Sequence, residues 1–196
     1  MKHPFSHQLY AYWNERRGAR RTPERADIEP GAMRRILGDS FVLSCDAEED
    51  HLFRVAGTRL CALFGRELRG QPFSTIWDAE SAADVSELVT VASDEAVAVA
   101  AGAEAQTQSQ TQARIDDKLR CSIELLLLPL AHRGKSGNRM LGLIAAFERP
   151  YWLGIWPAQP LRLGVIQYLG PTPGPASSEL RRWARRSLTV IDGGRS

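Results

Sequence analysis

The first apolar residues of the chain recur with the spacing of a helix. Residues 8–17 (QLYAYWNERR) predict a helix that places Leu9, Tyr12 and Trp13 on one face, and Gly18 is suited to end it. An apolar face of this kind is rarely left uncovered on an isolated domain. We therefore expect it either to pack on the chain's own sheet or to meet another chain.

Short strands and short helices follow. Pro30 is placed to open a short helix. Residues 41–45 and 52–56 predict two strands joined by an acidic hairpin turn. The apolar residues between positions 60 and 64 then form one face of a further short helix, which Gly65 is expected to end.

The middle of the chain predicts a long helix and then a polar segment. Residues 78–102 are rich in Ala, Val and Glu, and their apolar positions, up to Val99, recur near the helical period. Residues 106–112 alternate Gln with Thr or Ser. As a strand this run would have two polar faces, which indicates the edge of a sheet; a loop of low complexity is the alternative.

The last third of the chain predicts antiparallel strands. Residues 119–125 alternate between apolar and polar positions, which places Cys121, Ile123 and Leu125 on the buried face. A second apolar strand is expected over residues 140–147, and residues 161–169 continue the apolar pattern as a further strand or a docking segment.

This order of elements predicts an α+β fold. We expect an antiparallel sheet with helices packed on one face, and an additional helix at the N-terminus. Residues 1–38 would form the N-terminal helical extension, residues 39–169 the domain that contains the sheet, and residues 170–196 a Pro/Gly linker with a basic tail.

The composition is that of a soluble globular protein. Of the 196 residues, 43% are hydrophobic and 24% are charged. The 25 basic side chains nearly balance the 23 acidic ones, so no nucleic-acid partner is expected, and the RRWARR run of the tail is expected to be a solvated end. No signal peptide or membrane-spanning run is apparent, which indicates a cytoplasmic protein of bacterial type.

The sequence shows no catalytic or metal-binding motif. Cys45, Cys61 and Cys121 lack the CxxC spacing of the common zinc sites. The GKSGN run at residues 134–138 lacks the first glycine of a phosphate-binding loop, because position 129 is proline. No histidine lies beside a plausible nucleophile, so we expect no enzymatic activity.

Two segments carry a resemblance to a known family. Residues 53–77 (FRVAGTRLCALFGRELRGQPFSTIW) contain a strand, a short helix, an FG turn and an ELxG run before the expected long helix, and they resemble the core of a PAS domain. Residues 12–30 (YWNERRGARRTPERADIEP) resemble the corresponding segment of short bacterial stand-alone PAS proteins. The resemblance covers roughly residues 8–150 and implies a sensory or protein-interaction module in signal transduction.

The resemblance also indicates which cofactors to consider. Flavin-binding relatives carry a reactive cysteine in an Asn-Cys-Arg-Phe-Leu run after the Gly-Tyr turn, whereas Cys61 precedes the FG turn here. Haem-binding relatives use a histidine on the long helix, and residues 78–102 contain none. Flavin and haem are therefore both disfavoured, and the cofactor is unknown.

From this resemblance we expect a cytoplasmic sensor or adaptor that contacts signalling proteins such as a kinase or a regulator, with a small apolar ligand as an additional candidate. The alternative is a receptor whose cavity carries the function, followed by an enzyme on a related fold. In PAS relatives the ligand cavity is surrounded by the elements that here contribute Phe53, Val55, Leu60, Cys61, Phe64, Trp77, Ile123 and Leu143. Because an N-terminal helix that flanks a PAS core often supplies a dimer contact, the candidate dimer or partner face consists of Leu9, Tyr12 and Trp13.

Overall fold

The computed structural model describes residues 1–45, 50–107, 120–132, 135–148, 151–152 and 155–169, and of residues 135–137 only the backbone. The described residues form a six-stranded antiparallel sheet with the order β2-β1-β5-β4-β3-β6. The strands are β1 (Ser40–Ser44), β2 (Phe53–Ala56), β3 (Ala98–Gln106), β4 (Arg120–His132), β5 (Lys135–Ala146) and β6 (Arg162–Leu169).

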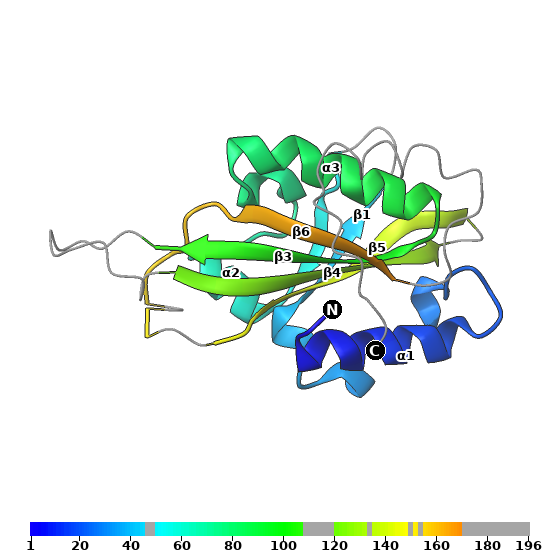
Figure 1. Ribbon diagram of the computed structural model, residues 1–196. Coiled ribbons are helices and arrows are strands. Elements are labelled where there is room, and N and C mark those ends of the chain that lie inside the picture. The colour runs from blue at the N-terminus through cyan, green and yellow to red at the C-terminus, as the bar shows by residue number, and fades with distance from the viewer. Residues whose placement is uncertain (46–49, 108–119, 133–134, 149–150, 153–154, 170–196) are drawn as a thin grey trace, which may run out of the picture.

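Helices lie on both sides of this sheet, with α3 on one side and α1 on the other (Figure 1). The α-helices are α1 (Pro4–Arg17), α2 (Thr58–Phe64) and α3 (Ala79–Asp94). Short 3-10 helices connect them to the strands: η1 (Arg25–Asp27), η2 (Pro30–Met33), η3 (Leu37–Asp39) and η4 (Phe73–Ile76).

The central strand β4 is buried on both faces. Its run LLLLPL is apolar at consecutive positions, which is typical of a strand covered on both sides. Leu125 and Leu127 belong to the core cluster that includes α2 and α3, whereas Leu126 and Leu128 belong to the cluster that includes α1. The sheet therefore separates two hydrophobic cores.

The expected α+β fold is confirmed, and so are most of its elements. The helix predicted at residues 8–17 lies within α1, and Gly18 follows it with a φ of 56°, which a glycine adopts readily. The strands expected at residues 41–45 and 52–56 are β1 and β2, which pair antiparallel. The segment expected at residues 161–169 as a strand or docking segment is strand β6.

The prediction of one helix over residues 78–102 was wrong. Helix α3 ends at Asp94, and strand β3 begins at Ala98, so that Val99 lies in a strand. Alanine has the highest intrinsic helix propensity, but propensity is a weak influence on the final structure, and here the pairing of β3 with both β4 and β6 outweighs it. Ala96 marks the change of direction, with a φ of 53°.

The first residue of the Gln-rich run, Gln106, lies in a strand. Strand β3 ends at Gln106, and the buried Thr107 donates its hydroxyl hydrogen to the Pro157 carbonyl oxygen at 3.0 Å. The rest of the run lies in residues 108–119, outside the described part of the chain, as do residues 170–196.

The register of β4 gives a stability prediction. Ile123 is buried with Cys121 and Leu125 on the face toward α2 and α3, while Arg120 and Ser122 lie on the other face. We expect Ile123→Ala to lower the free energy of unfolding by about 2–4 kcal/mol, because it leaves a cavity in this core. Urea denaturation measures the loss, and Ser122→Ala, on the opposite face, is the control. A loss below about 0.5 kcal/mol would contradict this register.

Candidate functional site

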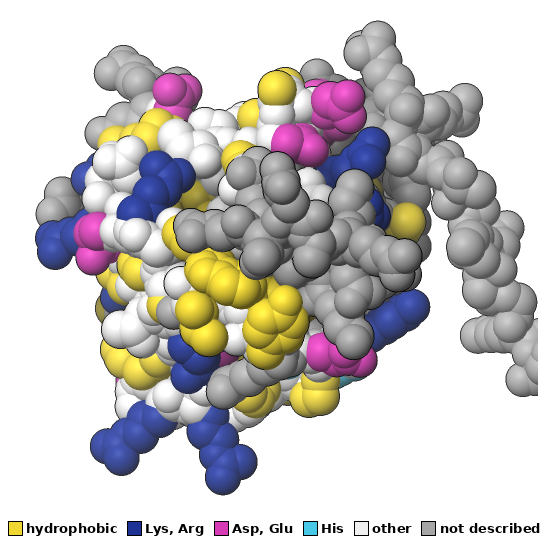
Figure 2. Space-filling view, turned by 90° about the vertical axis from the view of Figure 1, so that its left-hand side faces the viewer, with side chains coloured by type: hydrophobic (Ala, Val, Ile, Leu, Met, Phe, Trp, Pro, Cys, Tyr) yellow, Lys and Arg dark blue, Asp and Glu magenta, His cyan; other side chains and the backbone are white. Residues whose placement is uncertain are grey.

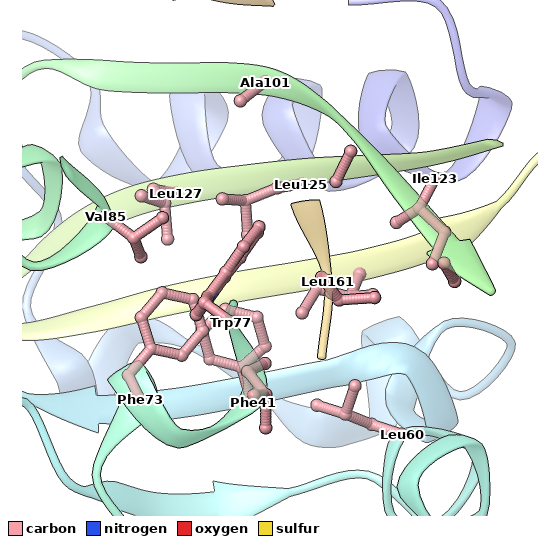
Figure 3. Close-up of a cluster of buried hydrophobic side chains, with 14 of the residues drawn as sticks. Phe41, Leu60, Phe73, Trp77, Val85, Ala101, Ile123, Leu125, Leu127 and Leu161 are labelled. Atoms are coloured by element: carbon pink, nitrogen blue, oxygen red, sulfur yellow. The ribbon is translucent and has the colours of Figure 1, made fainter. Parts of the chain in front are cut away.

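The space between the sheet and helices α2 and α3 is where the family resemblance places a ligand. Here it is filled by the rings of Phe41, Phe53, Phe73 and Trp77, whose neighbouring centroids lie 5.3–5.7 Å apart. Figure 3 shows three of these rings gathered among the aliphatic side chains of the sheet. A Cβ atom at Gly142 would lie 2.0 Å from Cζ of Phe41, so glycine at this position of β5 is what admits the ring.

The residues predicted to line a ligand cavity are therefore mainly packed in the hydrophobic core. The members buried in this core are Phe53, Leu60, Phe64, Trp77 and Ile123, and Cys61 is half-buried beside it. Burial is the main cause that raises the pKa of the Cys61 thiol, so the side chain is a poor nucleophile. A small cavity of about 60 Å³ beside Leu60 and Ile123 has room for roughly two water molecules.

Two of the predicted cavity residues do not belong to this space, and for them the prediction was wrong. Leu143 lies in the core on the α1 side of the sheet, because side chains alternate along β5. Val55 pairs with Val42 across the β1–β2 ladder, points away from the aromatic core, and is 51% exposed.

Val55 instead borders an apolar groove on the outside of the domain. The groove has a volume of about 200 Å³ and lies between the segment that carries η1 and η2 and the strands β1 and β2. Its lining is mainly apolar and includes Ile28, Pro30, Met33, Leu37, Val42, Val55 and Leu141. Among the described residues that line it, Arg25 alone is charged.

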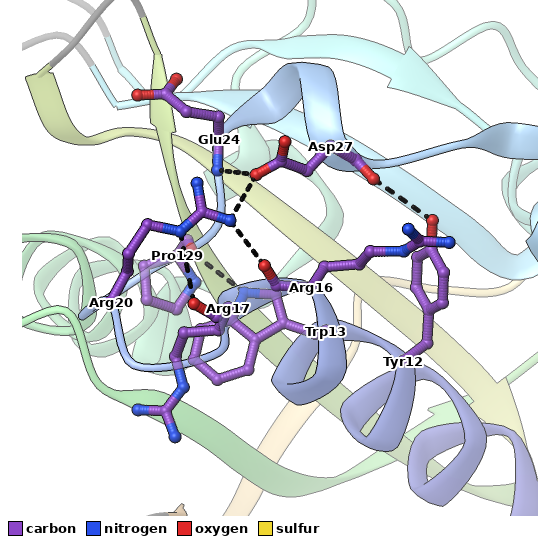
Figure 4. Close-up of polar contacts among 8 residues, drawn as sticks. All are labelled: Tyr12, Trp13, Arg16, Arg17, Arg20, Glu24, Asp27 and Pro129. Atoms are coloured by element: carbon purple, nitrogen blue, oxygen red, sulfur yellow. Dashed lines mark hydrogen bonds and ion pairs between the residues drawn. The ribbon is translucent and has the colours of Figure 1, made fainter.

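A network around Asp27 joins η1 to the end of α1, next to the groove residue Arg25 (Figure 4). The Asp27 carboxylate accepts hydrogen bonds from the Arg20 guanidinium at 2.7 Å and from the Glu24 backbone N–H at 3.0 Å. The hydrogen bond from Arg20 is the main cause that holds the pKa of Asp27 below its usual value. These contacts hold η1 close to the end of α1. Because Arg25 belongs to η1, they also hold this groove residue in place.

The same N-terminal region is attached to the end of strand β4. Trp13 donates its indole N–H to the Pro129 carbonyl oxygen at 2.9 Å, and the Ala131 backbone N–H donates to the Pro23 carbonyl oxygen at 2.9 Å. The run at residues 12–30 that carries the family resemblance thus forms both the Asp27 network and the attachment to the sheet.

The apolar face of α1 packs on the chain's own sheet. Leu9 and Trp13 are buried in the α1-side core, and Tyr12 is partly buried against it. Leu9 and Trp13 are therefore not exposed to a second chain, and the expectation of a dimer or partner face formed by these three residues is corrected to packing within one chain.

A second group of exposed apolar side chains lies where β5 leads toward β6. Figure 2 looks at this end of the molecule and shows hydrophobic side chains beside residues that are not described. Phe147, Tyr151 and Ile155 are exposed there. Because residues 149–150 and 153–154 lie outside the described part, the apolar groove is the better-defined candidate surface.

Comparison with protein families agrees with this architecture. A family model described as PAS domain matches residues 1–145, which is well over half of the chain. The chain belongs to the PAS domain family. No curated protein and no solved structure matches it. The match includes α1, the Asp27 network and every residue that lines the apolar groove, whereas β6 lies beyond it.

Within the described part of this PAS domain protein, none of the helices has the length and apolar character needed to cross a membrane. The same residues contain no cluster of three or more His, Cys, Asp or Glu side chains arranged for a metal ion. The His51 ring is placed within hydrogen-bond distance of Ser86 and Thr90 on α3.

Sequence reasoning missed the role of Glu124 in this PAS domain. Glu124 lies on the face of β4 opposite Ile123, as the alternation predicts, but it is only 5% exposed because the N-terminus of the chain covers it. Its carboxylate accepts the backbone N–H groups of Lys2 at 2.6 Å and His3 at 2.9 Å. A charged residue within the run SIELLLL was the available signal.

Several groups determine the charge state of Glu124. Burial is the largest influence and by itself raises the pKa of the carboxyl. Four groups outweigh burial and lower the pKa below its ordinary 4.5: the two backbone N–H groups, the N-terminal amine and the nearby hydroxyl of Ser6. The Ser6 hydroxyl acts through its dipole, since it forms no hydrogen bond with a described residue. Glu124 is therefore a charged anchor for the start of α1.

This anchor predicts an acid-dependent loss of stability. At pH 7 we expect Glu124→Gln to lower the free energy of unfolding by about 1–3 kcal/mol, since the backbone N–H groups lose a charged acceptor. As pH falls below the ordinary pKa of 4.5, the unfolded chain takes up the proton first, so this contribution of Glu124 is lost as pH passes through the lower folded pKa. The gap between wild type and variant should therefore narrow from pH 5 downward.

Urea denaturation from pH 7 to pH 3 measures this gap. Glu80→Gln is the matched control, because the Glu80 side chain is largely exposed and lies 3.7 Å from Arg162. A gap that stays constant down to pH 3 would show that Glu124 does not act through its charge.

Proposed function

We propose that this PAS domain protein is a non-enzymatic signal-transduction adaptor of the cytoplasm, and that it binds a signalling protein such as a kinase or a regulator. PAS domains serve sensory and signalling roles in general. The observation that carries the proposal is the apolar groove, an open surface whose lining is apolar apart from Arg25 and Ser40. Surfaces of this kind mark sites of interaction.

The packed core supports a protein partner over an internal ligand. Ligand cavities commonly have volumes of about 300–1,000 Å³. The cavity beside Leu60 has about 60 Å³, and aromatic rings fill the space where PAS relatives hold ligands. The groove, at about 200 Å³, is suited to a few apolar side chains of another protein.

Site-specific crosslinking in the native cell tests this proposal. A photo-reactive amino acid at Val55, on the rim of the groove, is compared with one at Val165, which is 68% exposed on the distant edge strand β6. We expect a signalling protein to be crosslinked from position 55 and not from position 165. The captured protein should bind the purified chain, and Val55→Asp should abolish that binding. Equal labelling from both positions, or no adduct at position 55, would contradict the proposal.

A further inference from the structure

We infer that the apolar groove selects an acidic partner, and that its occupant is a segment of the partner protein in which large apolar side chains lie next to Asp or Glu. This inference deepens the proposed function by giving the chemistry of the partner. It rests on the charges around the groove and on the groove's apolar lining.

Around the groove, most carboxylates form ion pairs with described residues, whereas several arginines do not. All three carboxylates between residues 25 and 39 lie within 4 Å of an arginine from elsewhere in the chain. These pairs are Asp27 with Arg20, Glu29 with Arg16, and Asp39 with Arg59.

The arginines within the same stretch have no such partner. Arg25, Arg34 and Arg35 form no ion pair with any described residue. Arg25 lines the groove, while Arg34 and Arg35 are exposed immediately after η2, whose residues Pro30 and Met33 line it. Over residues 24–39, three arginines without an ion pair to a described residue thus stand against one such carboxylate, Glu24, so the segment presents net positive charge, which is complementary to an acidic partner.

The apolar lining accounts for the second requirement. Met33, Leu37 and Val55 border a groove with little polar surface, so a purely polar acidic peptide would leave this surface uncovered. An apolar side chain that enters the groove gains from the removal of this surface from water. A flanking carboxylate would then reach Arg25 at the groove itself.

A pair of small probes tests the chemistry of the groove on the purified full-length chain. The anionic dye 8-anilinonaphthalene-1-sulfonate is compared with neutral N-phenyl-1-naphthylamine, which shares its apolar rings. We expect the anion to bind about two- to fivefold more tightly, and Arg25→Ala to remove this preference. Val55→Asp should weaken both probes, and Val165→Asp should weaken neither. Equal affinity for the two probes, or an anion preference that survives Arg25→Ala, would overturn the inference.

The crosslinked partner provides the second test. We expect the adduct from position 55 to map to a segment with apolar and acidic residues, and Arg25→Glu to weaken binding at least about fivefold at low salt. A partner that binds through Val55 without an effect of Arg25→Glu would overturn this inference and leave the proposed function standing. Absence of any adduct would overturn the proposed function, while the probes still decide the chemistry of the groove. Binding of the chain to anionic phosphatidylglycerol vesicles through Arg25 would point to a membrane surface and overturn the protein occupant.

Discussion

Replacement of Trp77 by alanine is expected to lower the free energy of unfolding by about 3–5 kcal/mol. Trp77 is 4% exposed and its ring lies 5.7 Å from that of Phe73, in the space that separates the sheet from the helices. Its indole N–H is buried and has no hydrogen-bond partner among the described residues, so the side chain contributes through packing. Trp77→Phe, which keeps an aromatic ring, should cost much less.

The same variant tests whether Trp77 is what fills the space between the sheet and helices α2 and α3. An apolar cavity created by a large-to-small substitution can bind an apolar molecule of the missing size. We therefore expect indole to restore part of the stability of Trp77→Ala and to leave the wild type unchanged. Urea denaturation with and without indole measures this. A variant that loses stability without any response to indole would mean that neighbouring side chains collapse into the space.

The elements that sequence reasoning predicted well are those with a clear period. The first residues of β4, from Arg120 to Leu125, alternate between polar and apolar, and α1 combines a helical period with a glycine at its end, so local pattern and tertiary packing agree there. Strand β3 was missed because its Ala-rich sequence is compatible with a helix. Its strand conformation depends on β4 and β6, which pair with it from distant parts of the sequence.

The apolar groove could not be predicted from a motif. Its lining comes from η1, η2, η3 and the strands β1, β2, β4 and β5, and the β1–β2 register places Val55 on the face toward it. Val55 was selected from the sequence, but for the cavity on the other side of the sheet. A one-residue difference in register reverses the face to which a side chain points, and short strands such as β2 carry too little pattern to fix it.

Removal of residues 1–20 is expected to abolish cooperative folding of the chain. The deletion takes away α1 and exposes the apolar face of the sheet that α1 covers, which includes Leu126, Leu128, Leu141 and Leu143. It also removes the backbone N–H partners of Glu124, leaving that carboxylate beside newly exposed apolar surface. The deletion removes more buried apolar surface than any single substitution does. The free energy of unfolding that is lost with it should therefore exceed the marginal stability of a domain of this size.

Light scattering and thermal denaturation compare the intact and shortened chains. Because α1 packs on its own sheet, the shortened chain should aggregate or lose its thermal transition, while Trp13→Ala should keep a transition at reduced temperature. Trp13→Phe separates packing from the hydrogen bond to Pro129, and it should cost about 0.5–1.5 kcal/mol. A shortened chain that stays soluble, folded and monomeric, obtained from an intact dimer, would show instead that α1 exchanges between chains. In that outcome the α1 that contacts the Asp27 network would come from the second chain. The groove would then be complete only in the dimer, and partner binding would depend on protein concentration.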